Sequence, residues 1–151
     1  MLGHDGAAVL LDGGEVVAPI EEEGLKRIKH SNKFPVRAIG CVLHEARVEL
    51  ADVDRVAFYF DAAHLDAVLR KSALRARARA ISIREALRLQ LLGAFGVSVE
   101  PSRLCFVPHH RAHAASAFHP SGFERSLVVT LDGRGERDSG LVARADERAI
   151  D

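Results

Sequence analysis

Short apolar runs that end at glycine, proline or charged residues alternate with helix-like periodicities along the whole chain. Residues 7–11 and 15–20 are apolar runs on either side of an Asp-Gly-Gly turn at residues 12–14. This spacing predicts a β-hairpin, because glycine supplies the positive φ that a tight turn needs. Pro19 lacks a backbone donor, so its strand is expected at a sheet edge or to end there. The order of strands, helices and hairpins predicts a mixed α/β fold.

The middle of the chain is expected to be mainly helical. Residues 21–28 predict a short helix, and Pro35 can open the next helix, whose apolar positions recur at three- and four-residue steps as far as Ala46. Residues 53–60 are rich in strand-forming side chains and predict a strand. Residues 62–95 carry two further apolar patches at helical spacing.

The charge pattern limits the partners that this chain can be expected to bind. Its 21 lysine and arginine residues balance 21 aspartate and glutamate residues, so no global field draws it to nucleic acid or anionic lipid. A basic stripe on the helical middle could bind phosphate, but a solvated helix face is the favoured interpretation, because stacking aromatic residues are missing. No apolar run reaches the roughly 18 residues of a membrane span, and the N-terminus does not resemble a signal peptide. We therefore expect a cytoplasmic location, with neither nucleic acid nor membrane as a partner. The stripe consists of Arg70, Lys71, Arg75, Arg77 and Arg79.

The strongest chemical signal is a pair of histidines in the last third of the chain. Residues 104–107 predict a short strand, and the alanine-rich segment after Pro108 predicts a helix. On that helix His109 and His113 occupy positions i and i+4, so both imidazoles project from one face and can share a metal ion. Taken alone, such a pair more often consists of ordinary surface or core histidines than of metal ligands.

An aspartate at the end of the next strand strengthens the metal hypothesis. Residues 126–131 are the clearest predicted buried strand, and this strand delivers Asp132, with a return strand predicted over residues 139–144. The carboxylate can be a hard oxygen ligand or a phosphate-side group, and the backbone of the turn at Gly133 and Gly135 can cradle an anion. Two histidines and one carboxylate suit iron(II) and leave open positions for a phosphoryl or carbonyl oxygen, while zinc(II) is an alternative.

Two other polar positions are weaker candidates. His30 stands in a basic neighbourhood that favours the neutral imidazole, which can donate and accept hydrogen bonds. His4 and Asp5 form a polar break before the first apolar run. For each of these positions a structural or surface role is the more frequent outcome.

In their order along the chain, these residues resemble the N-terminal domain of the O-carbamoyltransferases of antibiotic and nodulation-factor biosynthesis. Each matching block is moderately specific, whereas the ordered set over nearly the whole chain is highly specific. The blocks are residues 4–8, 21–23, 27–30, 34–35, 52–54, 109–118 and 131–136.

The resemblance implies a fold, a reaction and a set of site residues. The fold is the first half of an actin/sugar-kinase/Hsp70-like (ribonuclease H-like) domain. In the family, a separate domain makes carbamoyl-adenylate from carbamoyl phosphate and ATP, and the N-terminal domain transfers the carbamoyl group to a hydroxyl of a small-molecule natural product. A divalent metal, iron(II), lies among the residues that match His109, His113 and Asp132. The resemblance puts His30 beside the carbamoyl donor as the catalytic residue. It also implies donor or substrate contacts for His4, Asp5, Lys29, Gly133 and Gly135.

The chain departs from the family pattern in ways that predict a partial domain. The first strand before His4 is almost absent, and Gly24 stands where arginine is usual. We therefore expect residues 1–151 to lack the second half of the fold and the adenylate-forming domain, and to need the missing half in cis or in trans for activity. A half-fold exposes apolar surface, so self-association is expected. Two alternatives stay open: a non-catalytic remnant or interaction module that binds no metal, and a tRNA threonylcarbamoyladenosine-type transferase, which the sequence fits less well.

Overall fold

In the computed structural model of the protein, the described residues are 6–27, 33–133 and 136–151. The predicted site residues His4, Asp5, Lys29, His30 and Gly135 lie outside these ranges. The chain divides into two compact units, each described by itself below. The first comprises Met1–Asp54 and Arg88–Val99, and the second comprises Arg55–Leu87 and Glu100–Asp151.

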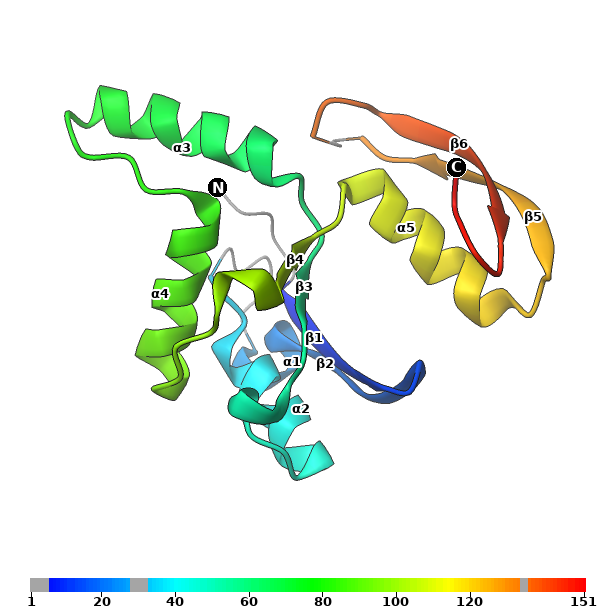
Figure 1. The fold of residues 1–151 in the computed structure, drawn as a ribbon, viewed down its shortest axis with the longest axis horizontal. Coiled ribbons are helices and arrows are strands. Elements are labelled where there is room, and N and C mark those ends of the chain that lie inside the picture. The colour runs from blue at the N-terminus through cyan, green and yellow to red at the C-terminus, as the bar shows by residue number, and fades with distance from the viewer. Residues whose placement is uncertain (1–5, 28–32, 134–135) are drawn as a thin grey trace. The chain divides into compact units, whose positions relative to one another are not determined.

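The first unit contains the predicted hairpin. Strands β1 (Ala7–Asp12) and β2 (Glu15–Glu21) pair antiparallel (Figure 1). Gly13 and Gly14 take positive φ in the turn between them. Pro19 lies opposite Val9 in a sheet of two described strands, which confirms its predicted edge position. The register shifts by one residue after Leu10, as in a β-bulge.

Two helices follow this hairpin in the first unit. Helix α1 (Glu22–Lys26) begins directly after β2, and α2 (Val36–Ala46) begins after Pro35 and packs on both strands. Glu22 is fully buried, accepts the N–H of Ala38 at 2.6 Å and faces the ammonium group of Lys26. Because the proline at the start of α2 offers no side-chain acceptor, the Glu22 carboxylate satisfies one of the free N–H groups of that helix.

The second unit contains a parallel strand pair with a helix after each strand. Strands β3 (Val56–Phe58) and β4 (Leu104–Phe106) pair in parallel, and α3 (Ala62–Arg75) and α5 (His109–Phe118) follow them within a few residues. The strand predicted over residues 53–60 is therefore present but shorter. Since the carboxyl ends of parallel strands meet at one edge, the N-termini of α3 and α5 begin at the same edge of this pair.

The helical middle is two helices with a break at residues 76–82. Arg77 takes a positive φ of 51° in the break, and α4 (Ile83–Phe95) begins where the Asp66 carboxylate accepts the N–H of Ile83 at 2.6 Å. Gly96, with a φ of 69°, follows the last residue of α4, as predicted, whereas Gly93 lies inside the helix. Among the described residues, three short 3-10 turns complete the helical elements: Leu50–Asp52, Pro101–Arg103 and His119–Ser121.

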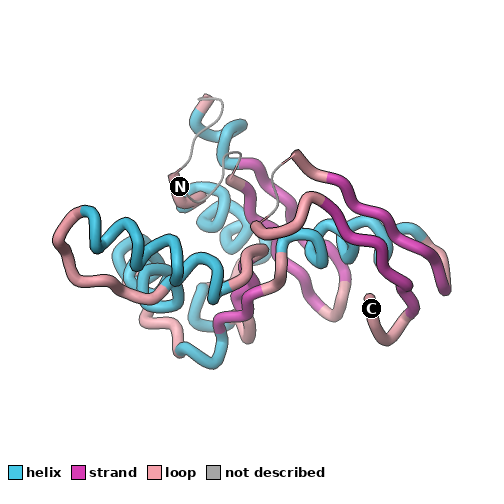
Figure 2. The backbone as a smooth tube through the Cα atoms, turned by 90° about the horizontal axis from the view of Figure 1, so that it is seen from above, coloured by secondary structure: helices cyan, strands magenta, loops and turns pink. Residues whose placement is uncertain are grey.

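The last two strands form a second antiparallel hairpin, seen among the strands of Figure 2. Strands β5 (Arg125–Leu131) and β6 (Gly140–Asp146) pair over their full length, and α5 packs on one face. On that face Thr130, Ala143 and Ala145 are buried. After β6 the chain turns back, and Ile150 forms an isolated bridge with Ala145.

The prediction that residues 126–131 form a buried strand is wrong for one of its two faces. The outer face of the hairpin carries four apolar side chains that are 57–86% exposed: Leu127, Val129, Leu131 and Val142. A continuous apolar run indicates a strand but does not distinguish one covered face from two. With this exception the mixed α/β class is confirmed, with three two-stranded sheets among the described residues. No described helix combines the length and the apolar character that crossing a membrane requires.

Candidate metal centre

The candidate ligands on α5 lie beside the stripe that this helix buries. His110, Ala114 and Phe118 are the buried residues of the helix, and their four-residue spacing places them on one stripe, against the β5–β6 hairpin. His109 and His113 precede the first two of these residues by one position and therefore form the neighbouring stripe. Burying the first stripe consequently fixes the direction in which the two histidines project.

Three ligand atoms from α5 and the end of β5 converge. The Nε2 atom of His109 lies 2.7 Å from Oδ2 of Asp132 and 3.1 Å from Nε2 of His113. The third side of this triangle, from Nε2 of His113 to Oδ2 of Asp132, is 3.7 Å. The His109 side chain is 13% exposed, whereas Asp132 is 35% and His113 is 52% exposed. Within this cluster His109 is the most buried ligand and His113 is the most exposed to solvent.

The spacing and chemistry of these atoms fit a divalent metal. Metal–nitrogen bonds of about 2.1 Å that meet at about 90–110° separate neighbouring ligand atoms by about 3.0–3.4 Å. The three observed separations, from 2.7 to 3.7 Å, bracket that range. Nδ1 of His109 is buried and has no hydrogen-bond partner among the described residues. The distances above show that the His109 ring turns Nε2, and not Nδ1, toward the other two ligands.

The turn that follows Asp132 is attached to the starts of two helices through Glu136. The Glu136 carboxylate accepts the N–H of Asp61, which precedes α3, and lies 3.4 Å from the N–H of His109, the first residue of α5. Pro108 gives α5 no side-chain cap of its own, so Glu136 supplies an acceptor there. The carboxylate also places negative charge at the positive end of the helix dipole.

The aromatic rings of Tyr59 and Phe60 lie beside His109. The ring centroids of Phe60 and Tyr59 lie 5.7 and 6.0 Å from that of His109, and Phe58 packs edge-on to Phe106 at 6.2 Å. These rings limit access of water to His109 from this side. The ligand triangle is therefore open to solvent on the side of His113 and Asp132.

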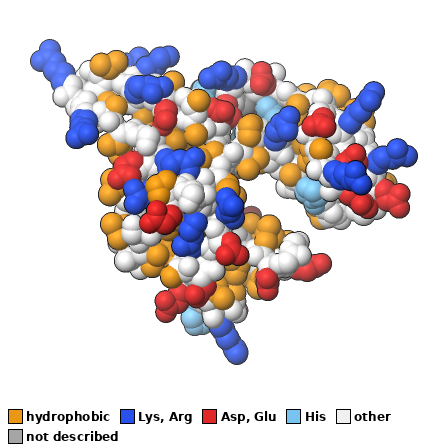
Figure 3. Space-filling view, viewed as in Figure 1, with side chains coloured by type: hydrophobic (Ala, Val, Ile, Leu, Met, Phe, Trp, Pro, Cys, Tyr) orange, Lys and Arg blue, Asp and Glu red, His pale blue; other side chains and the backbone are white. Residues whose placement is uncertain are grey.

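The structure brings together the three predicted metal ligands and describes one further predicted site residue. Gly133 follows Asp132 directly, and nothing lies within 4 Å of the Cβ that a larger residue would add there. This glycine is therefore not required by close packing among the described residues. The residues of the basic stripe are all exposed, as predicted, but Arg77 and Arg79 lie in the break after α3 and not on a helix face. Figure 3 shows basic side chains gathered over α3.

Sequence reasoning assigned no role to His110 or Glu136, which both contact the site's supporting elements. A signal for His110 is its four-residue spacing from Ala114 and Phe118, which predicts a buried histidine. A signal for Glu136 is the proline before α5, which leaves helix N–H groups in need of a distant acceptor.

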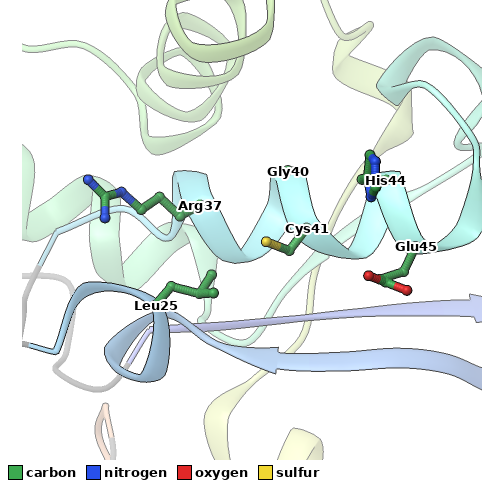
Figure 4. Close-up of a pocket in the computed structure, with 6 residues that line it drawn as sticks. All are labelled: Leu25, Arg37, Gly40, Cys41, His44 and Glu45. Atoms are coloured by element: carbon green, nitrogen blue, oxygen red, sulfur yellow. The ribbon is translucent and has the colours of Figure 1, made fainter.

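An open surface pocket of about 400 Å³ in the first unit contains no predicted site residue. It runs along α2, where Leu25 of α1 lies near Cys41 (Figure 4). Cys41 is a free, half-buried thiol. The lining residues are Leu25, Arg37, Gly40, Cys41, His44 and Glu45.

The fold and the site define a mixed α/β protein with a candidate two-histidine, one-carboxylate metal centre. Residues 1–149 match the family described as carbamoyltransferase N-terminus. The chain is 49% identical over 142 residues to nodulation protein NolNO of Sinorhizobium fredii, a match that covers 93% of this chain and 21% of that protein. It is 36% identical over 151 residues to the uncharacterized protein sll1178 of Synechocystis sp., covering 88% of this chain and 24% of that protein.

This chain belongs to the carbamoyltransferase N-terminus family. The family predicted from the ordered sequence blocks is thereby confirmed. The chain spans about a fifth to a quarter of the length of these two relatives.

Proposed function

We propose that this chain is the N-terminal portion of an ATP-dependent carbamoyltransferase. The complete enzyme moves a carbamoyl group from carbamoyl phosphate, through carbamoyl-adenylate, to a hydroxyl of a small-molecule natural product. The observation that carries the proposal is the convergence of His109, His113 and Asp132 in a chain of this family. Within the proposal, the two units are parts of the first half of an actin/sugar-kinase/Hsp70-like domain.

In this proposal the three converging residues hold a divalent metal, with iron(II) as the first candidate. When bound, the metal supplies Lewis-acid polarisation of a carbonyl or phosphoryl oxygen of the donor. Asp132 contributes the negative charge of the ligand set, and the two imidazoles bind through Nε2. Because His113 is half-exposed and His109 is packed against aromatic rings, the donor is admitted on the His113 side.

The remaining proposed contacts follow from family membership. His30 is the proposed catalytic residue beside the donor, and Gly133 lies directly after the metal ligand Asp132 in the turn that can offer N–H groups to a donor anion. The acceptor is proposed to be a small molecule with a free hydroxyl. A cytoplasmic location is proposed, because ATP and carbamoyl phosphate are intracellular metabolites. The other proposed donor or acceptor contacts are His4, Asp5, Lys29 and Gly135.

The outer face of the β5–β6 hairpin supports the need for a further part of the fold, in cis or in trans. Its four apolar side chains are between 57% and 86% exposed. Full burial of one such side chain contributes about 1.5–3 kcal/mol, and about two thirds of each side chain is still exposed, so covering all four would stabilise the protein by roughly 4–8 kcal/mol. Without such a cover, the same face favours self-association of the chain.

Reconstituted carbamoyl transfer tests the proposed function. The chain is mixed with the separately expressed remainder of the NolNO relative, and transfer of labelled carbamoyl groups from carbamoyl phosphate and ATP to a panel of hydroxyl acceptors is measured. His113→Ala is expected to abolish transfer, whereas His119→Ala, at an exposed histidine outside the ligand triangle, keeps it. Equal transfer activity of the His113→Ala and His119→Ala variants would exclude the proposed role of His113 as a metal ligand. No transfer by any mixture, together with no metal binding, would support the non-catalytic alternative.

A further inference from the structure

His110 is a buried histidine placed between the two candidate ligands of α5. The residue is only 8% exposed. Nδ1 lies 2.9 Å from Oγ1 of Thr130, and Nε2 lies 2.8 Å from the carbonyl oxygen of Asp138. Both ring nitrogens therefore have a partner, and neither is available to bind a metal.

These two hydrogen bonds select one tautomer of the neutral ring. The carbonyl oxygen of Asp138 can only accept, so Nε2–H of His110 donates to it. Nδ1 then carries the lone pair and accepts the hydroxyl proton of Thr130. Replacing the threonine hydroxyl by a methyl group would leave a buried nitrogen without a donor, which is costly in a dry environment.

One partner of His110, Thr130, lies on β5, and the other, Asp138, lies in the segment just before β6, at the end of the hairpin from which Asp132 emerges. Thr130 precedes Asp132 by two residues on β5. Asp138 precedes Ser139, whose carbonyl oxygen accepts the N–H of Asp132 at 2.9 Å. His110 therefore attaches the hairpin end, from both sides, to the helix that carries His109 and His113.

Besides the Glu136 contact to the N–H of His109 and an exposed hydrogen bond from Arg111 to the carbonyl oxygen of Ile150, the helix meets the hairpin mainly through small side chains. The buried residues that α5 and β6 contribute here include Ala114, Ala143 and Ala145, which are 0–3% exposed. Methyl groups allow close approach but interdigitate little, so they leave sliding and rolling of the helix weakly opposed. Phe118 is also buried, but it lies two turns further along the helix.

We propose that His110 and Thr130 are positioning residues that hold Asp132 against His109. The three residues His110, Thr130 and Asp138 are called the His110 latch. This inference rests on the proposed metal centre, because the latch acts by keeping the carboxylate of Asp132 close to the two histidine ligands. Supporting residues of this kind typically change metal affinity by about 10–100-fold when they are replaced.

A matched pair of substitutions at Thr130 tests the latch. Thr130→Val keeps the shape of the side chain and removes the hydroxyl, whereas Thr130→Ser keeps the hydroxyl. Cobalt(II) is titrated anaerobically into each folded protein, with its visible spectrum as the readout, and hydrogen exchange of the Asp132 amide is measured without metal. We expect Thr130→Val to bind cobalt(II) about tenfold more weakly and Thr130→Ser to stay within about twofold of the parent chain. The Asp132 amide is expected to exchange about tenfold faster in Thr130→Val only.

Ala143→Gly serves as the control for general loosening of the same packing. It removes a buried methyl group and leaves the latch in place. An equal loss of cobalt(II) affinity in Ala143→Gly and Thr130→Val would overturn the positioning role. Parental affinity and parental Asp132 exchange in Thr130→Val would overturn the latch. If Thr130→Val does not fold, His110→Leu removes both bonds from the helix side and is judged by the same two readouts.

The two proposals fail in distinguishable ways. If the parent chain binds no cobalt(II), the proposed metal centre is overturned, and the positioning role falls with it. The exchange rates of the Asp132 amide in the Val and Ser variants then still show whether the hydrogen-bonded latch exists. If the parent binds cobalt(II) and Thr130→Val binds it equally well, only the positioning role is overturned.

Discussion

Replacing Glu22 should destabilise the first unit far more than replacing its neighbour Glu21. The Glu22 carboxylate is fully buried, accepts the N–H of Ala38 and faces the ammonium group of Lys26, whose side chain is 17% exposed. A hydrogen bond to a charged group contributes about 1.5–3 kcal/mol, and a neutral one about 0.5–1.5 kcal/mol. Glu22→Gln keeps an acceptor but loses the charge, so it should lower the free energy of unfolding by about 1.5 kcal/mol.

Glu22→Ala removes the acceptor altogether and should cost about twice as much. It leaves the N–H of Ala38 buried without a partner, at about 1–3 kcal/mol, and removes the ion pair with Lys26, at up to about 1 kcal/mol. The expected total is about 3 kcal/mol, or a fall in Tm of roughly 6–12 °C for a chain of this size.

Urea unfolding followed by circular dichroism measures both changes in free energy. Glu21→Gln, at an exposed position, is the control and should stay within about 0.5 kcal/mol of the parent. A Glu22→Ala variant as stable as the Glu21→Gln control would refute the capping role of this carboxylate.

Two further predictions concern the β5–β6 hairpin. Leu131 is 86% exposed on its outer face, so Leu131→Lys should reduce self-association in sedimentation equilibrium while changing the free energy of unfolding by less than about 0.5 kcal/mol. The control Leu74→Lys, at a 78% exposed position on α3, should leave self-association unchanged. Equal effects of the two variants would contradict self-association through the outer face of the hairpin. A Cβ at Gly140 would lie 2.7 Å from the carbonyl oxygen of Thr130, so Gly140→Ala should destabilise the chain by about 1–3 kcal/mol in thermal unfolding. The control Gly24→Ala, whose added Cβ would have nothing within 4 Å, should be neutral or slightly stabilising. A neutral Gly140→Ala variant would contradict the pairing register of β5 and β6.

The elements and the ligand triad follow from local sequence signals. Asp12-Gly13-Gly14 between apolar runs predicts the first hairpin because only a few residue types suit its turn. His109 and His113 are predicted to share a face because a helix repeats every 3.6 residues. Asp132 is predicted as the third ligand because it ends the next strand, and the ordered family blocks support that prediction, although no local rule states which helix the end of β5 will meet.

What the sequence could not predict depends on contacts between distant segments. The burial of Glu22 arises because α2 begins beside α1, and the acceptor role of Glu136 arises because two helices start at one edge of the β3–β4 pair. The exposure of Leu131 depends on what covers the hairpin, which an apolar run does not encode. The predicted roles of His30, Lys29, His4, Asp5 and Gly135 lie outside the described residues and stay predictions.

Metal content is the most direct test of the proposed centre. The chain is purified anaerobically, and iron and zinc are quantified by elemental analysis beside the double variant His109→Ala, His113→Ala and the control variant His119→Ala. We predict near-stoichiometric iron in the parent and the control, and its loss in the double variant, because two of three ligands are removed. No bound metal in the parent after anaerobic purification and iron(II) addition, or equal metal in the double variant, would contradict a centre built from these residues.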